Sequence, residues 1–301
     1  MEGVTIMTTS VYEVVTDRIL AMLEKGTVPW RQTWKGSPGL RTPRNLVSGK
    51  EYRGVNTMLL ACQGYESPYW LSFKQALDKG GNVRKGEKGT PAIFWKVGER
   101  KDKLTSSGKP EKSFLLRYYT VFNLSQCDGI ESPEKPSAPK AFSPLAECES
   151  LVKLYKTIPP IHHGGGRAYY SPDFDKIGMP EPAAFNSREE YYSTLFHELT
   201  HSTGHKERLN REGITNPIQF GSHAYSFEEL VAECGASFLC NRAGIDSATL
   251  ENSAAYIATW AKKLKSEPKW IVEAASKAGK AVDYMLGIQY EEKKEVQEAA
   301  E

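Results

Sequence analysis

Two histidines and a glutamate in the second half of the chain have the spacing of a metal-binding helix. The segment is His197-Glu198-x-x-His201. Residues four apart on an α-helix leave the same face, so both imidazoles can meet one Zn²⁺ ion at about 2.0–2.1 Å. Glu198 would then face the water that completes the coordination, where its carboxylate can take a proton. This pattern predicts metal-assisted hydrolysis; two solvent-facing histidines on a surface helix are the competing interpretation.

Such a centre needs a third ligand from another element. A second helix is predicted from Ser226, and in it Glu229 and Glu233 lie four residues apart on one face. We predict that Glu229 binds the metal and that Glu233 accepts a hydrogen bond from the far nitrogen of a ligand histidine, as in gluzincin peptidases. Ser226-x-x-Glu229 also has the form of a capping box, which would turn Glu229 back to its own helix start and leave Glu228 or Glu233 as the ligand. The small residues that follow Glu229 favour it, because they allow a close helix approach.

Peptide hydrolysis also needs a donor for the oxyanion of the tetrahedral intermediate. Tyr225 and His223 lie just before the glutamates and are candidates for this role, although both residue types are also common at helix caps and surfaces. Residues 168–171 after a run of glycines are predicted to form a strand, either an edge strand along which an extended peptide can pair or a plain structural strand.

Capping signals place the helices that carry these side chains. Ser187 and Glu190 have the spacing of a capping box, and the helix that follows contains both histidines and ends at Gly204. A second box, Ser10-x-x-Glu13, opens an amphipathic helix near the start of the chain. Shorter helices are predicted over residues 56–62 and 72–79, and strands over 91–97 and 114–122.

Charge divides the chain of 301 residues into two parts. Residues 1–125 hold 20 Lys and Arg against 11 Asp and Glu, a net charge of +9, whereas the remainder has a net charge of −7. Four prolines between residues 126 and 144 predict a linker, because proline disfavours both helix interiors and central strands. We therefore predict an α+β protein of two domains, each with its own core: 1–125, linker 126–144, 145–289 and a charged tail 290–301.

The basic half combines cations with aromatic rings, the composition of a single-strand binder. Cations follow the phosphates, and flat rings stack on unpaired bases whatever their identity. A solvated charged face with core aromatics is the alternative interpretation. The candidate DNA-binding residues are Trp30, Arg31, Trp34, Arg41, Arg44, Arg53, Lys74, Lys85 and Lys88.

Composition excludes several other classes of protein. No apolar run reaches the length of a membrane span, and the first residues lack the basic start of a secretion signal, so no membrane partner is expected. The five cysteines are scattered and odd in number, which is typical of thiols in a reducing compartment. The expected location is cytoplasmic.

Both halves together resemble the ArdC-type antirestriction proteins of conjugative plasmids. The matching segments are Val28-Pro29-Trp30, Tyr52-Arg53-Gly54-x-Asn56, Trp70-Leu71-Ser72-Phe73-Lys74-Gln75-Ala76, Gly86-Glu87-Lys88-Gly89, Phe196 to His205 and Glu228 to Glu233. The resemblance implies an N-terminal domain that is similar to TraC-type primases and binds single-stranded DNA. It also implies a zincin-like metallopeptidase domain, holding zinc or manganese, and a role in protecting transferred DNA from host restriction.

Two other functions compete with this expectation. A free-standing cytoplasmic metallopeptidase would use its basic half only to recognise an acidic substrate. A non-catalytic single-stranded DNA-binding protein would use its metal only as a structural element, and would oppose restriction by occupying the DNA or a host protein such as the restriction enzyme. The sequence does not separate them, because a set of ligands predicts metal binding and not turnover.

Overall fold

The structure is a computed structural model that describes residues 10–30, 42–104, 110–133, 143–216, 222–245 and 254–289. The helices are α1 (Val11–Glu24), α2 (Val55–Ala61), α3 (Phe73–Asp78), α4 (Pro144–Leu154), α5 (Arg188–Ser202), α6 (Glu212–Thr215), α7 (His223–Ala243), α8 (Ala254–Ser266) and α9 (Trp270–Leu286). The strands are β1 (Arg44–Asn45), β2 (Tyr69–Ser72), β3 (Asn82–Val83), β4 (Thr90–Leu104), β5 (Pro110–Asn123), β6 (Cys127–Asp128), β7 (Ile161–His163), β8 (Tyr169–Ser171) and β9 (Lys176–Met179). The mixture of helices and sheets confirms the α+β class. None of the helices in these ranges is long and apolar enough to cross a membrane.

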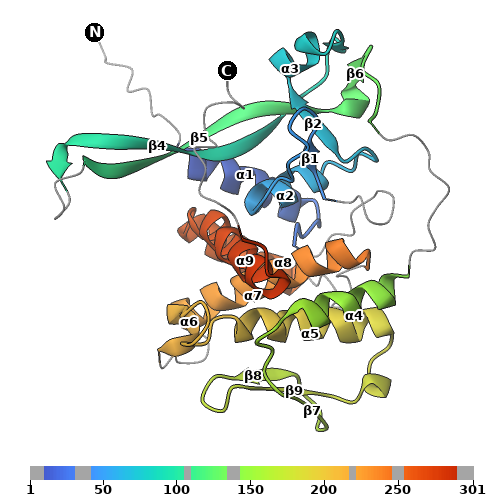
Figure 1. Ribbon diagram of the computed structural model, residues 1–301, viewed down its shortest axis with the longest axis vertical. Coiled ribbons are helices and arrows are strands. Elements are labelled where there is room, and N and C mark those ends of the chain that lie inside the picture. The colour runs from blue at the N-terminus through green and yellow to red at the C-terminus, as the bar shows by residue number, and fades with distance from the viewer. Residues whose placement is uncertain are drawn as a thin grey trace.

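The basic half is built on a four-stranded sheet in the order β1-β2-β5-β4 (Figure 1). β4 and β5 form a long antiparallel hairpin that contains the predicted strands over 91–97 and 114–122 and extends beyond both. β1 runs parallel to β2, and β3 pairs with β6 in a separate small sheet beside α3. The predicted capping box at Ser10 is present and starts α1.

The segment from Tyr52 to Asn56 joins this sheet to its helices. Gly54 has φ +56 at the start of α2, a backbone conformation that side chains disfavour. The carboxamide of Asn56 forms two hydrogen bonds of 2.8 Å with the backbone of Ile93, accepting from its N–H and donating to its carbonyl. β4 is an edge strand of the sheet, so Asn56 satisfies peptide groups that would otherwise have no strand partner. The segment from Tyr52 to Asn56 therefore has a structural role.

One hydrophobic core spans both halves of the chain. α1 and α2 lie between the β4–β5 hairpin and the C-terminal helices α8 and α9 (Figure 1), and buried residues of all these elements belong to one cluster. The fully buried Trp30 ring packs edge-on against Trp260 of α8, with ring centroids 5.7 Å apart. The expectation of fully separate cores is wrong, because the amphipathic helix α1 buries its apolar face against helices of the other half. A smaller cluster around Tyr52, Trp70 and Val121 lies within the basic half alone.

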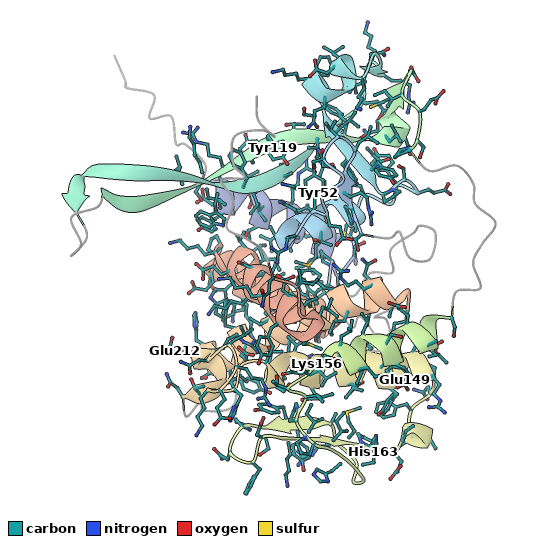
Figure 2. The ribbon with its side chains drawn as sticks, in the orientation of Figure 1. Tyr52, Tyr119, Glu149, Lys156, His163 and Glu212 are labelled. Atoms are coloured by element: carbon teal, nitrogen blue, oxygen red, sulfur yellow. The ribbon has the colours of Figure 1, made fainter. Side chains whose placement is uncertain are left out.

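The C-terminal half is a group of helices with a small sheet on one side. α5 and α7 pack together, and α4 and α9 contact α7. The sheet has the order β7-β9-β8 and lies against α5, at the opposite end of the molecule from Tyr52 and Tyr119 (Figure 2). β8 is an edge strand, one of the two alternatives for residues 168–171.

The connection between the halves starts later than residue 126, the predicted beginning of the linker. Cys127 and Asp128 form β6, which pairs with β3, so these residues still belong to the basic half. The Ser143 hydroxyl caps the N-terminus of α4, whose first residue is Pro144. Residues 134–142, which contain two of the four prolines, and the predicted tail 290–301 lie outside the described residues.

Candidate metal centre

Two packed helices bring His197, His201 and Glu229 together. The Ser187 hydroxyl accepts a hydrogen bond from the Glu190 N–H and starts α5, as predicted, and both histidines lie one turn apart on this helix. Glu229 comes from α7, which begins at His223 with Ser222 as its N-cap. The capping alternative at Ser226 is therefore wrong: this residue lies inside the helix, where its hydroxyl accepts a hydrogen bond from Lys263.

A glycine allows the two helices to approach. A Cβ atom added at Gly235 of α7 would lie 2.5 Å from Cγ2 of Thr200 on α5. Such a distance is a steric overlap, so any side chain at this position would push α7 away from the histidines. The small residues after Glu229 thus have the packing role that the sequence suggested.

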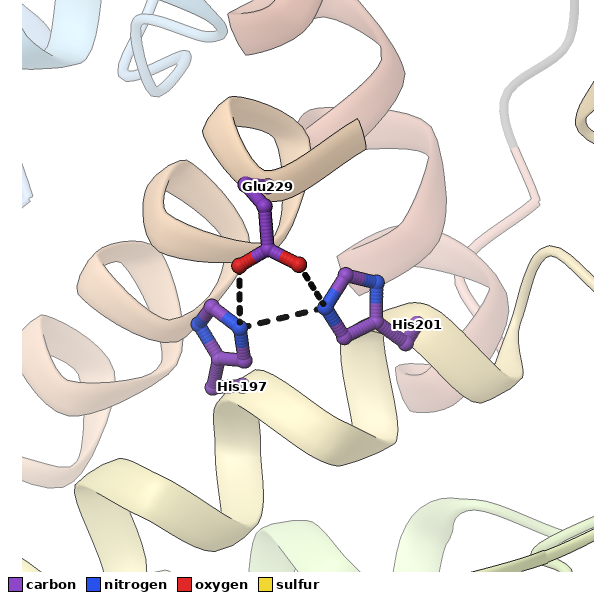
Figure 3. A group of neighbouring side chains, drawn as sticks. All are labelled: His197, His201 and Glu229. Atoms are coloured by element: carbon purple, nitrogen blue, oxygen red, sulfur yellow. Dashed lines mark hydrogen bonds and ion pairs between the residues drawn. The ribbon is translucent and has the colours of Figure 1, made fainter. Parts of the chain in front are cut away.

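The donor atoms have the separations of a metal-binding set (Figure 3). The Nε2 atoms of His197 and His201 are 3.1 Å apart, and the Glu229 oxygens lie 3.4 Å from the first and 3.6 Å from the second. Ligands at about 2.0–2.1 Å from one tetrahedral ion would be separated by about 3.3–3.4 Å. In the part of the chain that the structure describes, these residues form the one group of three or more His, Cys, Asp or Glu side chains able to hold a metal ion. The donor set therefore fits a divalent ion.

The charges of these residues stabilise one another in the metal-free protein. Burial acts to lower the pKa of His197, but the carboxylates of Glu229, Glu233 and Glu198 outweigh it and raise this pKa to about 9. Burial likewise acts to raise the pKa of Glu229, and the hydrogen bond and charges of the two histidines lower it to about 2. At neutral pH His197 is protonated and Glu229 is ionised.

We expect metal affinity to rise with pH because of this proton. A metal ion binds neutral imidazole, so below pH 9 it must displace the His197 proton, and affinity should rise about tenfold per pH unit up to that value. Competition titrations of Mn²⁺ against a chelator at pH 6.5, 7.5 and 8.5 measure this slope. Equal affinities at the three pH values would contradict the assigned protonation of His197.

Glu228, which the sequence suggested only as an alternative ligand, pairs instead with the far nitrogen of His201. Its Oε1 lies 3.4 Å from His201 Nδ1, while Glu229 faces Nε2 of the same ring. Glu228 also forms a buried ion pair with Arg211, whose Nη2 donates to Oε1 over 2.6 Å. Burial acts to raise the pKa of Glu228, but His201 and Arg211 together hold it below its ordinary value. This is the position predicted for Glu233, and sequence spacing alone gave no signal for it.

Glu233 is held by a different partner. Its Oε1 accepts a hydrogen bond of 3.1 Å from the hydroxyl of Tyr256 on α8. Its charge is among those that raise the pKa of His197, so its carboxylate acts on the other histidine of the pair. Its predicted hydrogen bond to a ligand histidine stays a prediction.

Glu198 and Tyr225 also lie at this centre, whereas His223 has other partners. Glu198 is buried, and its charge contributes to the raised pKa of both His197 and Tyr225. Burial and the neighbouring Glu229 carboxylate raise the pKa of Tyr225 to about 12, so its hydroxyl stays protonated and able to donate. The exposed His223 ring packs on Trp270, and its Nε2 lies 3.2 Å from Glu267. These contacts give no support to a catalytic role for His223.

The candidate DNA-binding residues fall into four groups. The prediction that Trp30 lies exposed for base stacking is wrong: the ring is fully buried in the shared core. Arg44 and Arg53 form ion pairs with Glu51 and Asp283. The side chains of Lys74, Lys85 and Lys88 are exposed, and Arg31, Trp34 and Arg41 lie outside the described residues.

Comparison with known proteins divides the chain in the same way as its charge. Residues 9–122 match the family model of the N-terminal domain of the anti-restriction factor ArdC, and residues 147–277 match that of a zincin-like metallopeptidase. The structure is similar to the crystal structure of the antirestriction protein ArdC from plasmid R388 in its metal-free form, with a TM-score of 0.71, 37% identity and coverage of 92% of this chain and 97% of the other. The Mn(II)-bound form gives a TM-score of 0.72 at the same identity, covering 93% and 98%.

Related sequences include longer proteins. A DNA primase TraC of Escherichia coli is 39% identical over 95% of this chain, which spans only 20% of the primase; a second TraC is 36% identical, and the chain spans 28% of it. The protein y4eC of Sinorhizobium fredii is 35% identical over 97% of both sequences.

Proposed function

The chain belongs to the ArdC family of antirestriction factors, and from this membership we propose that it is a plasmid-encoded protein that protects transferred DNA from host restriction. In this proposal the basic half binds single-stranded DNA, and the zincin-like half is a metal-dependent peptidase that acts on a host protein such as a restriction enzyme. The observation that carries the peptidase activity is the cluster of His197, His201 and Glu229, whose donor atoms have the separations of a tetrahedral metal site.

The centre would hold a divalent ion through His197, His201 and Glu229. We propose zinc, with manganese as the alternative because manganese is bound in a structure of the R388 relative. When bound, such an ion polarises a peptide carbonyl and acidifies water. Glu198, buried beside His197, takes the proton of the attacking water and later gives it to the leaving amine. Tyr225, protonated beside Glu229, donates a hydrogen bond to the oxyanion that develops on the substrate.

The edge strand β8 provides a place for an extended peptide substrate. It contacts α5, the helix that carries the two histidines, and among the described strands it pairs only with β9. A peptide that adds to such an edge gains main-chain hydrogen bonds whatever its sequence. We therefore propose that the substrate enters along residues 169–171.

Replacing Glu198 with glutamine separates peptidase action from binding alone. The amide cannot accept the proton, so hydrolysis should fall by about 10²–10⁴-fold while the ligand set stays complete. We expect transfer of a plasmid carrying Glu198→Gln into a restricting recipient to drop to the level seen without the protein. The measurement is the ratio of transfer frequencies into restricting and non-restricting recipients, with the exposed variant Glu267→Gln as control. Full protection by Glu198→Gln would favour the non-catalytic alternative.

For DNA, the exposed rings of the hairpin replace Trp30 as the proposed stacking surface. Trp95 on β4 is 41% exposed and Tyr118 on β5 is 51% exposed. Trp95 pairs with Leu116, and Tyr118 is two residues further along β5, so both rings leave the same face of the hairpin. Lys96 and Arg117 are exposed at neighbouring positions of the same strands, so they leave the opposite face and add positive charge to the hairpin.

We expect the full chain to bind single-stranded DNA more tightly than duplex DNA of equal length. Exposed rings interact only with unstacked bases, whereas charge alone favours the denser phosphates of a duplex. Trp95→Ala and Tyr118→Ala should each cost about 1–3 kcal/mol of binding free energy without lowering the melting temperature. Salt titrations with both DNA forms test this, and Leu115→Ala, which removes an exposed apolar side chain from the same strand, is the control. Equal or tighter binding of duplex DNA would show that the protein binds DNA through its positive charge and not through ring stacking.

A further inference from the structure

A polar pocket lies at the junction of the two halves. Both halves contribute polar side chains to its wall: Thr42, Glu51 and Arg53 from the basic half, and Asn241, Arg242 and Asp283 from α7 and α9. Including the open mouth, the space free of atoms is about 430 Å³. A water molecule takes up about 30 Å³ in the liquid, so this space admits a small solvated group. None of the described residues that line it belongs to the metal centre.

Two ion pairs cross the junction at this pocket. Arg242 of α7 pairs with Glu51 over 2.7 Å, and Arg53 pairs with Asp283 of α9. Arg44 contacts the other oxygen of Glu51. Three guanidinium groups thus face two carboxylates, and the group carries a net charge of +1. This charge matches one singly charged anion.

The ion pairs leave room for such an anion. The Arg53 side chain is 45% exposed and that of Arg242 is 31% exposed, so both pairs are in contact with water and hold their partners weakly. A guanidinium carries five N–H donors in a planar fork, and a phosphate can accept two of them in parallel. An arginine can therefore contact a phosphate while another edge of its fork stays on a carboxylate.

Gly279 of α9 is an independent indication of a ligand. It lies inside the helix, where glycine is less favourable than alanine. Its backbone is helical, and a Cβ atom added to it would meet no described atom closer than the Gly54 nitrogen, 3.9 Å away. Neither the backbone conformation nor the packing therefore requires a glycine here. A side chain at this position would instead enter the pocket, which Gly279 lines.

We propose that this pocket binds a phosphate group of single-stranded DNA, held between Arg53 and Arg242 and lying against the α9 backbone at Gly279. A phosphodiester carries one negative charge and so neutralises the group. This inference rests on the DNA binding proposed above. It adds that the metal-binding half, whose net charge is −7, supplies a cation to the DNA. Inorganic phosphate offers the same oxygens, so the test must distinguish the two sources.

The test measures binding of the full chain to a fluorescent oligo(dT) strand over a range of salt concentrations. Arg242→Gln removes the guanidinium and should weaken binding about tenfold. It should also reduce the slope of log K against log salt concentration by about 0.7, the value for one phosphate contact of a single strand. Gly279→Ala leaves every charge in place and should weaken binding by a similar factor, because its methyl group enters the pocket. The same change should raise the melting temperature, since alanine favours the helix.

Two matched variants serve as controls. Arg167→Gln removes an exposed cation of the same half that does not line the pocket, and Ser276→Ala adds helix propensity on the exposed face of α9, about one turn before Gly279. Both should keep the affinity of the wild type. Competition by inorganic phosphate at constant ionic strength identifies the source of the phosphate. If the pocket variants lose only this competition and keep their affinity for oligo(dT), the assignment to DNA is wrong.

The remaining outcomes separate this inference from the proposed function. Wild-type affinity in both Arg242→Gln and Gly279→Ala, with the wild type binding oligo(dT), would overturn this inference alone. Affinity that is lost in Arg242→Gln but kept in Gly279→Ala would show that Arg242 acts outside the pocket, and would overturn it as well. A wild-type protein that binds no single-stranded DNA would overturn the proposed DNA binding and this inference with it.

Discussion

Glu229→Ala is expected to remove stoichiometric metal from the purified protein. Its two oxygens face both histidines, so the variant leaves only His197 and His201, and two ligands do not hold a divalent ion tightly. The double variant His197→Ala/His201→Ala should likewise contain no stoichiometric metal. Elemental analysis of protein purified without chelator gives the metal content, and competition titration gives the affinity.

The control for this experiment is Glu198→Gln, which lies within the same helix turn but outside the ligand set. It should keep one metal ion per chain and lose hydrolysis. If Glu229→Ala keeps its metal and Glu233→Ala loses it, the ligand assignment is wrong, and Glu233 is the third ligand. Full metal content in the double histidine variant would contradict the centre as a whole.

Glu228→Ala is expected to be the most destabilising single change near the site. It leaves the Arg211 guanidinium buried without its carboxylate, and breaking a buried ion pair in this way costs about 3–5 kcal/mol of unfolding free energy. Arg211 also donates to the Thr203 hydroxyl and to the Thr200 carbonyl of α5, so its displacement should loosen the end of the histidine helix. Urea unfolding of the metal-free protein measures the loss.

Two further variants identify the cause of that loss. The double variant Arg211→Met/Glu228→Leu removes both charges, so it should recover most of the stability. It should not recover metal affinity, because the carboxylate beside His201 is still absent. Glu267→Ala removes an exposed partner of His223 and should change stability by about 0–1 kcal/mol. A Glu228→Ala protein as stable as wild type would show that the ion pair gives no net stabilisation.

A shared core also changes how the two halves should be studied. Trp30 and α1 pack against α8 and α9, so a truncation at the predicted linker would expose apolar residues on both fragments. Substitutions in the full chain are therefore the better way to separate DNA binding from metal binding. The relationship to TraC primases fits this picture, because the whole chain, and not one half of it, corresponds to part of those longer proteins.

The sequence by itself determined the features that depend on local spacing. A separation of four residues on a helix places His197 and His201 on one face whatever surrounds them, and the serine before each of α1 and α5 caps its helix through bonds within a single turn. Runs of β-branched and aromatic residues likewise predicted strands within β4 and β5, although not their full length or their pairing. The charge difference between the halves follows from composition alone.

Tertiary structure decided everything that depends on which elements meet. Glu228, Glu229 and Glu233 are all plausible ligands from their spacing, and only the packing of α7 on α5 at Gly235 selects the one that faces both Nε2 atoms. Composition could not distinguish an exposed ring from a buried one. Trp30 was therefore equally consistent with a DNA-binding surface and with a core, and only its packing against Trp260 of α8 shows that it is buried. Whether a side chain is buried depends on the element that packs against it, and Trp30 and Tyr256 come into contact only when the chain has folded.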